Sequence, residues 1–146
     1  MYKKILPIII FILIFICGIL FLLLKSPTAT IDHHTFIIDI AKTSREQEIG
    51  LAKYVTLPKD HAMYFPFAYS DYYAFWMKNM HFPIDMLFIQ NGKIVTIYKN
   101  VPVPKNNNEQ LPIYRPTAPV NAVLEINAGL AKTYGFRIND RVIISY

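Results

Sequence analysis

FWMKNMHFPIDMLFIQ, residues 75–90, organises the chain, because its second half predicts the first strand of a central β-hairpin. Residues 86–90 are apolar and typical of a strand, and residues 93–98 form a second run rich in β-branched side chains. Asn91-Gly92 between them is the strongest two-residue hairpin signal. Both faces of the hairpin are largely apolar, which predicts a position inside a β-structure that is covered on both sides.

The same hairpin gives Asp85 a particular place. If a type I′ turn forms and pairing continues without interruption, Gln90 lies opposite Lys93 and Asp85 lies opposite Tyr98. Asp85 is then the residue at which the chain enters the strand. A carboxylate in this place points into the mouth of the core or beside it.

The first half of the stretch predicts the site. It places the only tryptophan of the chain among polar side chains. Polar groups embedded in apolar sequence must find partners or face water, because burying them unpaired costs about 1–3 kcal/mol or more. The candidate ligand-binding residues are Trp76, Lys78, Asn79 and Asp85.

Two classes of function fit these residues. In the favoured one, the candidate residues and a nearby tyrosine cluster line a groove that binds a small molecule, a glycan or a peptide. The cluster comprises Tyr69, Tyr72 and Tyr73. The alternative is a hydrolase-like or isomerase-like enzyme that uses Asp85 with His81 or Lys78 as acid and base, but the sequence has no GxSxG or HExxH motif. A structural ion pair between Lys78 and Asp85 explains the same residues without any ligand.

An anchor is predicted at the N-terminus. Ile5–Leu24 is a run of 20 residues without a charge, which is long enough to cross a bilayer core of about 30 Å as a helix. Lys3 and Lys4 before it outweigh Lys25 after it, so the N-terminus is expected in the cytoplasm and the rest of the chain on the other side of the membrane. We therefore expect a signal anchor over residues 1–25, a linker over 26–34 and one domain over 35–146, in the envelope of a bacterial cell.

Charge and cysteine content exclude several other functions. Beyond the predicted anchor the chain carries 12 basic and 10 acidic side chains, a balance too even for a nucleic-acid-binding surface. Cys17, the only cysteine, falls within the anchor, so the domain can form neither a disulfide nor a cysteine-based metal site. His33 and His34 are adjacent and would point to opposite sides of a strand. We expect no metal and no cofactor.

The rest of the sequence predicts a mostly β fold. Thr43-Ser44-Arg45-Glu46 has the form of a capping box and predicts a short helix that ends near Lys53. A second short helix is expected between Asn127, as its cap, and Gly135, as its end. The proline-rich residues 101–119 can form neither a helix nor a central strand. Further strands are expected at residues 35–40, 62–67, 122–126 and 141–146, which gives an antiparallel β-sandwich or barrel-like domain with two short helices.

Three stretches in order resemble one known family. In chain order, TSREQEIGLAKY, FWMKNMHFPIDMLFI and VLEINAGLAKTYGFRINDRVII are similar to the motifs of the uncharacterised bacterial and archaeal family numbered 192 among the domains of unknown function. The resemblance covers roughly residues 36–146. It implies a mostly β domain of sandwich or barrel type with short helices, often attached to a signal or anchor segment. It implies no activity, because none is established for the family.

Overall fold

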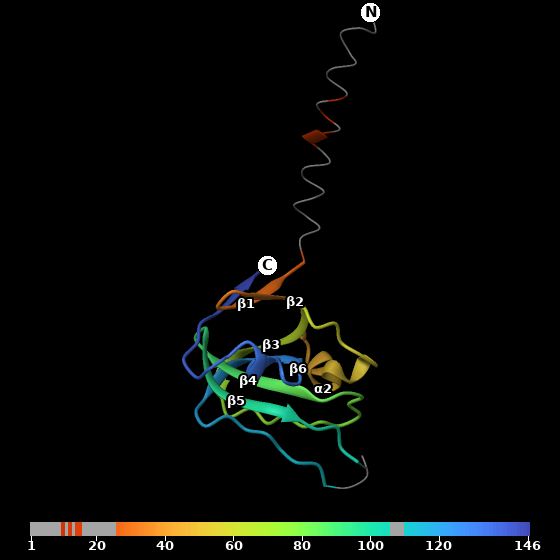
Figure 1. The fold of residues 1–146 in the computed structure, drawn as a ribbon, viewed down its shortest axis with the longest axis vertical. Helices are drawn as coiled ribbons and strands as arrows, with labels where there is room; N and C mark the ends of the chain where they lie inside the picture. Colours follow the sequence, from red (N-terminus) through yellow and green to blue (C-terminus); the bar gives the residue numbers. More distant parts are fainter. Residues whose placement is uncertain (1–9, 11, 13, 16–25, 106–109) are drawn as a thin grey trace, which may run out of the picture.

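The computed structural model describes residues 10, 12, 14–15, 26–105 and 110–146, and the described part is built on one curled sheet of seven strands (Figure 1). The strands follow the spatial order β5-β4-β6-β3-β2-β1-β7, and all neighbours are antiparallel except β2 and β3. Their bounds are β1 Thr28–Ile31, β2 His34–Ile40, β3 His61–Asp71, β4 Ile84–Gln90, β5 Lys93–Val101, β6 Val120–Asn127 and β7 Val142–Ser145. The predicted mostly β class is confirmed, and of the two predicted forms the curled sheet is closer to a barrel, because it resembles half of one and the described residues form no second sheet.

The predicted hairpin forms the β4–β5 pair. Asn91 and Gly92 both have positive φ, 49° and 72°, as a type I′ turn requires. The predicted register is wrong beyond the first two pairs. Ile89 still pairs with Ile94, but Phe88 pairs with Thr96, because β5 carries one extra residue at this point. Such a β-bulge depends on packing with distant segments, so the turn alone does not predict it.

Each face of the sheet carries its own apolar cluster, because successive side chains of a strand point to opposite faces. The first cluster includes Phe36, Leu87, Leu124, Ile126 and Phe136, together with the short helix α3 (Leu130–Thr133). The second cluster lies on the other face. Its members include Met63, Phe65, Met86, Phe88 and Leu51, and the segment 75–82 packs against it.

The predicted linker is in part a strand. Thr28–Ile31 forms β1, which pairs with β2 on one side and with β7 on the other. Ala29 and Ile31 are fully buried in the first cluster. The polar composition of this segment suggested a linker, but its two apolar residues alternate and so give it one core face.

Backbone hydrogen bonds also join the two ends of the sheet. The amide of Val142 donates to the carbonyl oxygen of Gly92 at 2.8 Å, and the amide of Asn139 donates to that of Ile94 at the same distance. These bonds connect the start of β5 with the segment that leads into β7. The sheet is therefore curled rather than flat.

The first helix follows its prediction closely. Thr43 accepts a hydrogen bond from the amide of Glu46, and the Glu46 carboxylate accepts one from the amide of Thr43, so the capping box is confirmed. Helix α2 (Ser44–Ile49) continues into the 3-10 helix η2 (Gly50–Lys53). Gly50 has a φ of +53° where they meet, and a Cβ there would lie 3.4 Å from the ring of Phe65.

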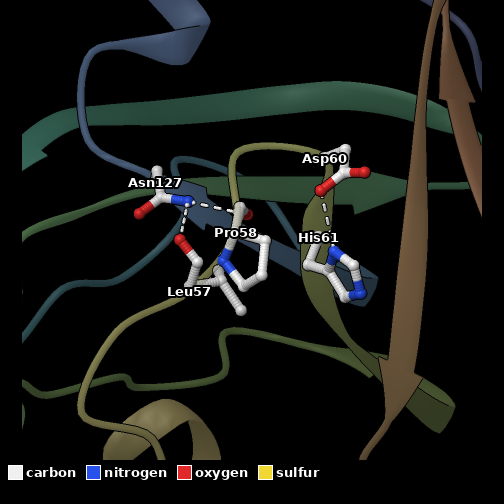
Figure 2. Close-up of polar contacts among 5 residues, drawn as sticks. All are labelled: Leu57, Pro58, Asp60, His61 and Asn127. Carbon is white, nitrogen blue, oxygen red and sulfur yellow. Dashed lines mark hydrogen bonds and ion pairs between the residues drawn. The ribbon is translucent and has the colours of Figure 1, made fainter.

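The predicted cap of the second helix is wrong. Helix α3 is capped by Gly129 rather than by Asn127. The Asn127 side-chain amide donates instead to the carbonyl oxygens of Leu57 and Pro58, at 2.9 and 3.0 Å (Figure 2). It thereby ties the end of β6 to the loop that precedes β3. Gly135, with a φ of +76°, ends the helical turn as predicted.

The predicted anchor Ile5–Leu24 lies almost entirely outside the described residues. Within the part of the chain that the structure describes, no helix is long and apolar enough to cross a bilayer.

Candidate functional site

Glu125 is the centre of the candidate site. It lies in the middle of β6, directly between Met63 of β3 and Met86 of β4, and its side chain points to the face of the second cluster. Only 4% of its surface is exposed. Charged side chains are rarely buried to this extent without a partner.

The Glu125 carboxyl group faces a cavity instead of a protein partner. No described residue donates a hydrogen bond to it. Among the described residues, every side-chain nitrogen or oxygen atom that is fully enclosed has a hydrogen-bond partner, so the unpartnered oxygens of Glu125 are not fully enclosed. The carboxyl oxygens therefore retain contact with the adjoining empty space. Burial raises the pKa of Glu125 to about 8, because the charged form loses its hydration. At neutral pH the group is mostly a neutral carboxylic acid.

The cavity in front of Glu125 has a volume of about 200 Å³. Five of the residues in its walls are aromatic, and these five come from β3 and from the segment that follows it. The aromatic residues are Phe65, Phe67, Tyr73, Phe75 and Trp76. Several of these rings hold one another in place. Phe67 stacks on Tyr73 with 3.6 Å between the ring centres, and Phe75 meets Phe65 edge-on with 5.2 Å between the ring centres.

Helix α2 forms another wall of the cavity. The Gln47 side-chain amide donates to the carbonyl oxygens of Ala41 and Pro66, both at 3.2 Å, and so fixes the helix against β3. Gln47, Glu48, Ile49 and Gly50 line the cavity from this side. The side-chain nitrogen of Gln47 is thereby occupied, Gln47 is only half-buried and Glu48 is exposed, so Glu125 is the one buried polar side chain among the residues that line the cavity.

Trp76 and Lys78 stand at the mouth. The Lys78 ammonium lies 5.4 Å from the centre of the Trp76 ring, within the range of a cation–π contact. Both residues also line a second hollow of about 420 Å³, which continues over Arg45, Ala52 and Asn79. The structure thus brings together three of the four predicted site residues, Trp76, Lys78 and Asn79.

Asp85, the fourth predicted site residue, lies elsewhere. It pairs with Ile126 and is fully buried on the face of the first cluster, opposite to the cavity. Its carboxylate accepts hydrogen bonds from three backbone amides: Asn100 at 2.7 Å, Gly129 at 3.1 Å and Ala131 at 2.8 Å. Asp85 therefore fastens the end of β5 and the start of α3 to the sheet, and backbone amides supply what Lys78 was expected to supply.

The remaining candidates are divided. His81 is exposed and lines neither hollow. Of the tyrosine cluster, Tyr73 belongs to the cavity wall, and its hydroxyl donates to the carbonyl oxygen of Tyr69 at 2.9 Å. Tyr69 and Tyr72 are exposed outside the cavity.

Sequence reasoning missed Glu125, although a signal was present. In VNAVLEIN, residues 120–127, Glu125 is the only charge in a strand that is otherwise apolar or amide-bearing. A lone acidic residue in the middle of a buried strand is costly to the fold and indicates either a buried partner or a site.

Fold and site together define a small, mostly β protein with an aromatic cavity over a buried acid. The family model of DUF192, described as an uncharacterized ACR, matches residues 27–144, and the chain belongs to this family. The resemblance stated from the three sequence motifs is thereby confirmed.

Two solved structures are similar to this chain, each with a TM-score of 0.70. One is a protein of unknown function from Novosphingobium aromaticivorans, 31% identical over 80% of this chain and 82% of its own. The other, from Sinorhizobium meliloti, is described as a "putative transcription regulator"; it is 32% identical over 81% of this chain and 91% of its own. The search of curated proteins gave no match.

Proposed function

We propose that this chain is a small-molecule-binding domain whose site is the aromatic cavity in front of Glu125. The observation that carries the proposal is the unpartnered carboxyl group, buried yet open to the cavity. A buried acid that no protein group compensates lowers the stability of the fold, and such groups concentrate at functional sites. A ligand that supplies the missing partner would recover this loss.

The cavity favours a small molecule over the glycan or peptide that were also considered. A sugar offers hydroxyl groups on all sides and requires several polar partners, whereas the enclosed part of this cavity presents one. A peptide needs an extended groove or a free strand edge. A compact apolar group with a single polar end fits a space of about 200 Å³ with aromatic walls.

Binding is also favoured over the catalytic alternative. Asp85, the predicted acid or base, is held by three backbone amides on the opposite face from Lys78. A general base must lie within hydrogen-bond reach of the proton that it moves, and the enclosed Asp85 carboxylate has no space beside it for a substrate.

We further propose that the domain is anchored to the membrane by its N-terminal segment and faces away from the cytoplasm. This proposal rests on the charge pattern around residues 5–24.

The test is a screen of small amines, alcohols and acids against the full chain in detergent micelles, followed by amide chemical shifts. We expect ligands to shift the signals of Gly50 and Phe75 and the indole signal of Trp76. Ala74→Phe places a ring at the cavity wall and should abolish these shifts. Ala68→Phe, at an exposed position outside the cavity, is the matched control. If Ala74→Phe leaves the bound ligands unaffected, or if no ligand shifts these signals, the cavity is not the site.

A further inference from the structure

We infer that the cavity selects a small organic ammonium ion: a protonated amine carried on an apolar body about the size of a benzene ring. The inference rests on the proposed function, because it names the ligand class of the same site. It combines the size of the cavity, the five aromatic residues of its walls and the single buried carboxyl group that lines it.

The size and walls of the cavity determine the body of the ligand. An enclosed apolar space of about 150 Å³ accepts benzene, so about 200 Å³ leaves room for a ring and one or two further heavy atoms. Phe65, Phe67 and Phe75 offer no hydrogen bond to such a body, and the hydroxyl of Tyr73 is occupied by Tyr69. The buried polar partner that the cavity offers to an enclosed ligand is therefore Glu125, with the half-buried amide oxygen of Gln47 as a further acceptor.

The charges in and around the cavity determine the polar end. An ammonium group carries only hydrogen-bond donors, and an ionised carboxylate carries only acceptors. The ammonium group of a ligand and the carboxylate of Glu125 therefore satisfy each other without a further protein group. Aromatic rings add a favourable cation–π contribution. A contact of this kind exists within the protein at the mouth, where the ammonium of Lys78 lies 5.4 Å from the centre of the Trp76 ring.

Binding of an ammonium ion is linked to loss of a proton. Burial holds Glu125 mostly neutral near pH 7, and an ammonium ion beside it favours the ionised form, so the carboxyl proton leaves to solvent as the ligand enters. The other ionisable groups that line the cavity are Glu48 from α2 and Tyr73 and Lys78 from the segment after β3. Glu48 and Lys78 are exposed and carry opposite charges, so their effects at the mouth partly cancel.

The probe pair that tests this inference is benzylamine and benzyl alcohol, which have the same shape and differ in charge. Chemical-shift titrations of the full chain in micelles should give a Kd for benzylamine on the order of 1 mM, as expected for a ligand of this size. Benzyl alcohol should bind about tenfold more weakly at pH 8.5. The affinity for benzylamine should rise about tenfold or more between pH 6.5 and 8.5, as Glu125 ionises, while that for benzyl alcohol should not rise. Calorimetry in two buffers of different ionisation enthalpy should show release of a proton at pH 7 with benzylamine only.

Two variants at the site complete the test. Glu125→Gln should weaken benzylamine about tenfold and remove its pH dependence, with less than a threefold effect on benzyl alcohol. Lys78→Met removes from the exposed mouth a positive charge that repels an ammonium ligand. It should raise the affinity for benzylamine about twofold to fivefold and leave the affinity for benzyl alcohol unchanged. Lys59→Met, at an exposed position that lines neither hollow, should change neither affinity. Because Lys78 is exposed, its variant remains informative if Glu125→Gln fails to fold.

The outcomes separate the ligand class from the proposed function. If benzyl alcohol binds in the cavity as tightly as benzylamine, or Lys78→Met leaves the affinity for benzylamine unchanged, the ammonium class is wrong while a small-molecule site remains. If neither probe shifts the cavity signals but alcohols or acids of the screen do, the ligand class is again wrong and the site stands. If no compound reaches the cavity, both proposals are overturned.

Discussion

Asp85 and Glu125 lie on neighbouring strands of the same sheet, yet their carboxyl groups have opposite surroundings. Asp85 pairs with Ile126, and Glu125, one residue earlier on β6, points to the other face. Asp85 meets three amide donors, whereas Glu125 meets a cavity. The difference between a structural acid and a candidate binding acid is therefore a difference of one position in strand register.

Replacement of Asp85 tests its structural role. Asp85→Asn keeps the shape but offers one carbonyl oxygen in place of two, and turns an amide group toward backbone donors. We expect a loss of about 2–4 kcal/mol in the free energy of unfolding, because the backbone amides of Asn100, Gly129 and Ala131 lose acceptors beside a fully buried side chain. Urea melts measure the change.

Asp71→Asn is the matched control, since Asp71 is exposed and accepts one backbone hydrogen bond, from Tyr72 at 2.7 Å. It should change stability by less than about 1 kcal/mol. An Asp85→Asn protein as stable as the wild type, at an unchanged denaturant slope, would contradict the structural role of Asp85.

The elements that could be predicted from the sequence are those set by local chemistry. Asn91-Gly92 predicted the β4–β5 turn because few residue pairs accept two successive positive φ angles. Thr43 and Glu46 predicted the start of α2 because their side chains satisfy each other's amides within one turn. In both cases the determining atoms lie within four residues.

The elements that could not be predicted depend on distant partners. Strand β1 is held by β2 and by β7, and β7 lies more than 110 residues further along the chain. The bulge in β5 brings the hydroxyl of Thr96 within 2.9 Å of that of Thr117, in the proline-rich segment. The site has the same limitation: Trp76, Lys78 and Asn79 are close in sequence and were predicted together, but Glu125 reaches the cavity from a strand 47 residues after Lys78.

Strand β1 gives a test at the level of a single element. We compare a chain that begins at Ser26 with one that begins at Asp32 and so lacks Thr28–Ile31. The shorter chain loses the buried Ile31 and Ala29 and leaves β7 without its neighbour. We expect it to be at least about 3 kcal/mol less stable, since burial of one isoleucine side chain alone contributes about 1.5–3 kcal/mol.

Urea denaturation followed by the fluorescence of Trp76 provides the measurement. Equal midpoints for the two chains would restore the original prediction that residues 26–34 are only a linker.

At the level of the whole molecule, orientation remains a prediction. By the positive-inside rule, Lys3 and Lys4 predict an N-terminus in the cytoplasm, and the domain is then expected outside it. Protease added to spheroplasts that express the full chain should digest the domain, while a cytoplasmic marker stays intact. Protection of the domain until the membrane is lysed would show the opposite orientation.

The cavity, the buried acid and the ligand proposal all depend on one property of the molecule, the neutral state of Glu125. With a folded pKa of about 8 against an ordinary value of 4.5, folding favours the protonated form. The unfolded chain loses this proton as the pH rises past about 4.5, whereas the folded protein keeps it until about pH 8. The contribution to stability is therefore complete below pH 4.5 and is lost progressively between the two values, by roughly 3–5 kcal/mol in all.

The most direct measurement is the free energy of unfolding of wild type and Glu125→Gln between pH 5 and 8.5, by urea melts of the full chain. All other titrating groups are the same in both proteins, so their contributions cancel in the difference between the two free energies of unfolding. We expect the wild type to lose about 3–5 kcal/mol relative to Glu125→Gln over this range, and the variant to be the more stable protein at pH 8.5. Two curves that run parallel from pH 5 to 8.5 would show that Glu125 titrates as an ordinary carboxylate, and would contradict the account of the site.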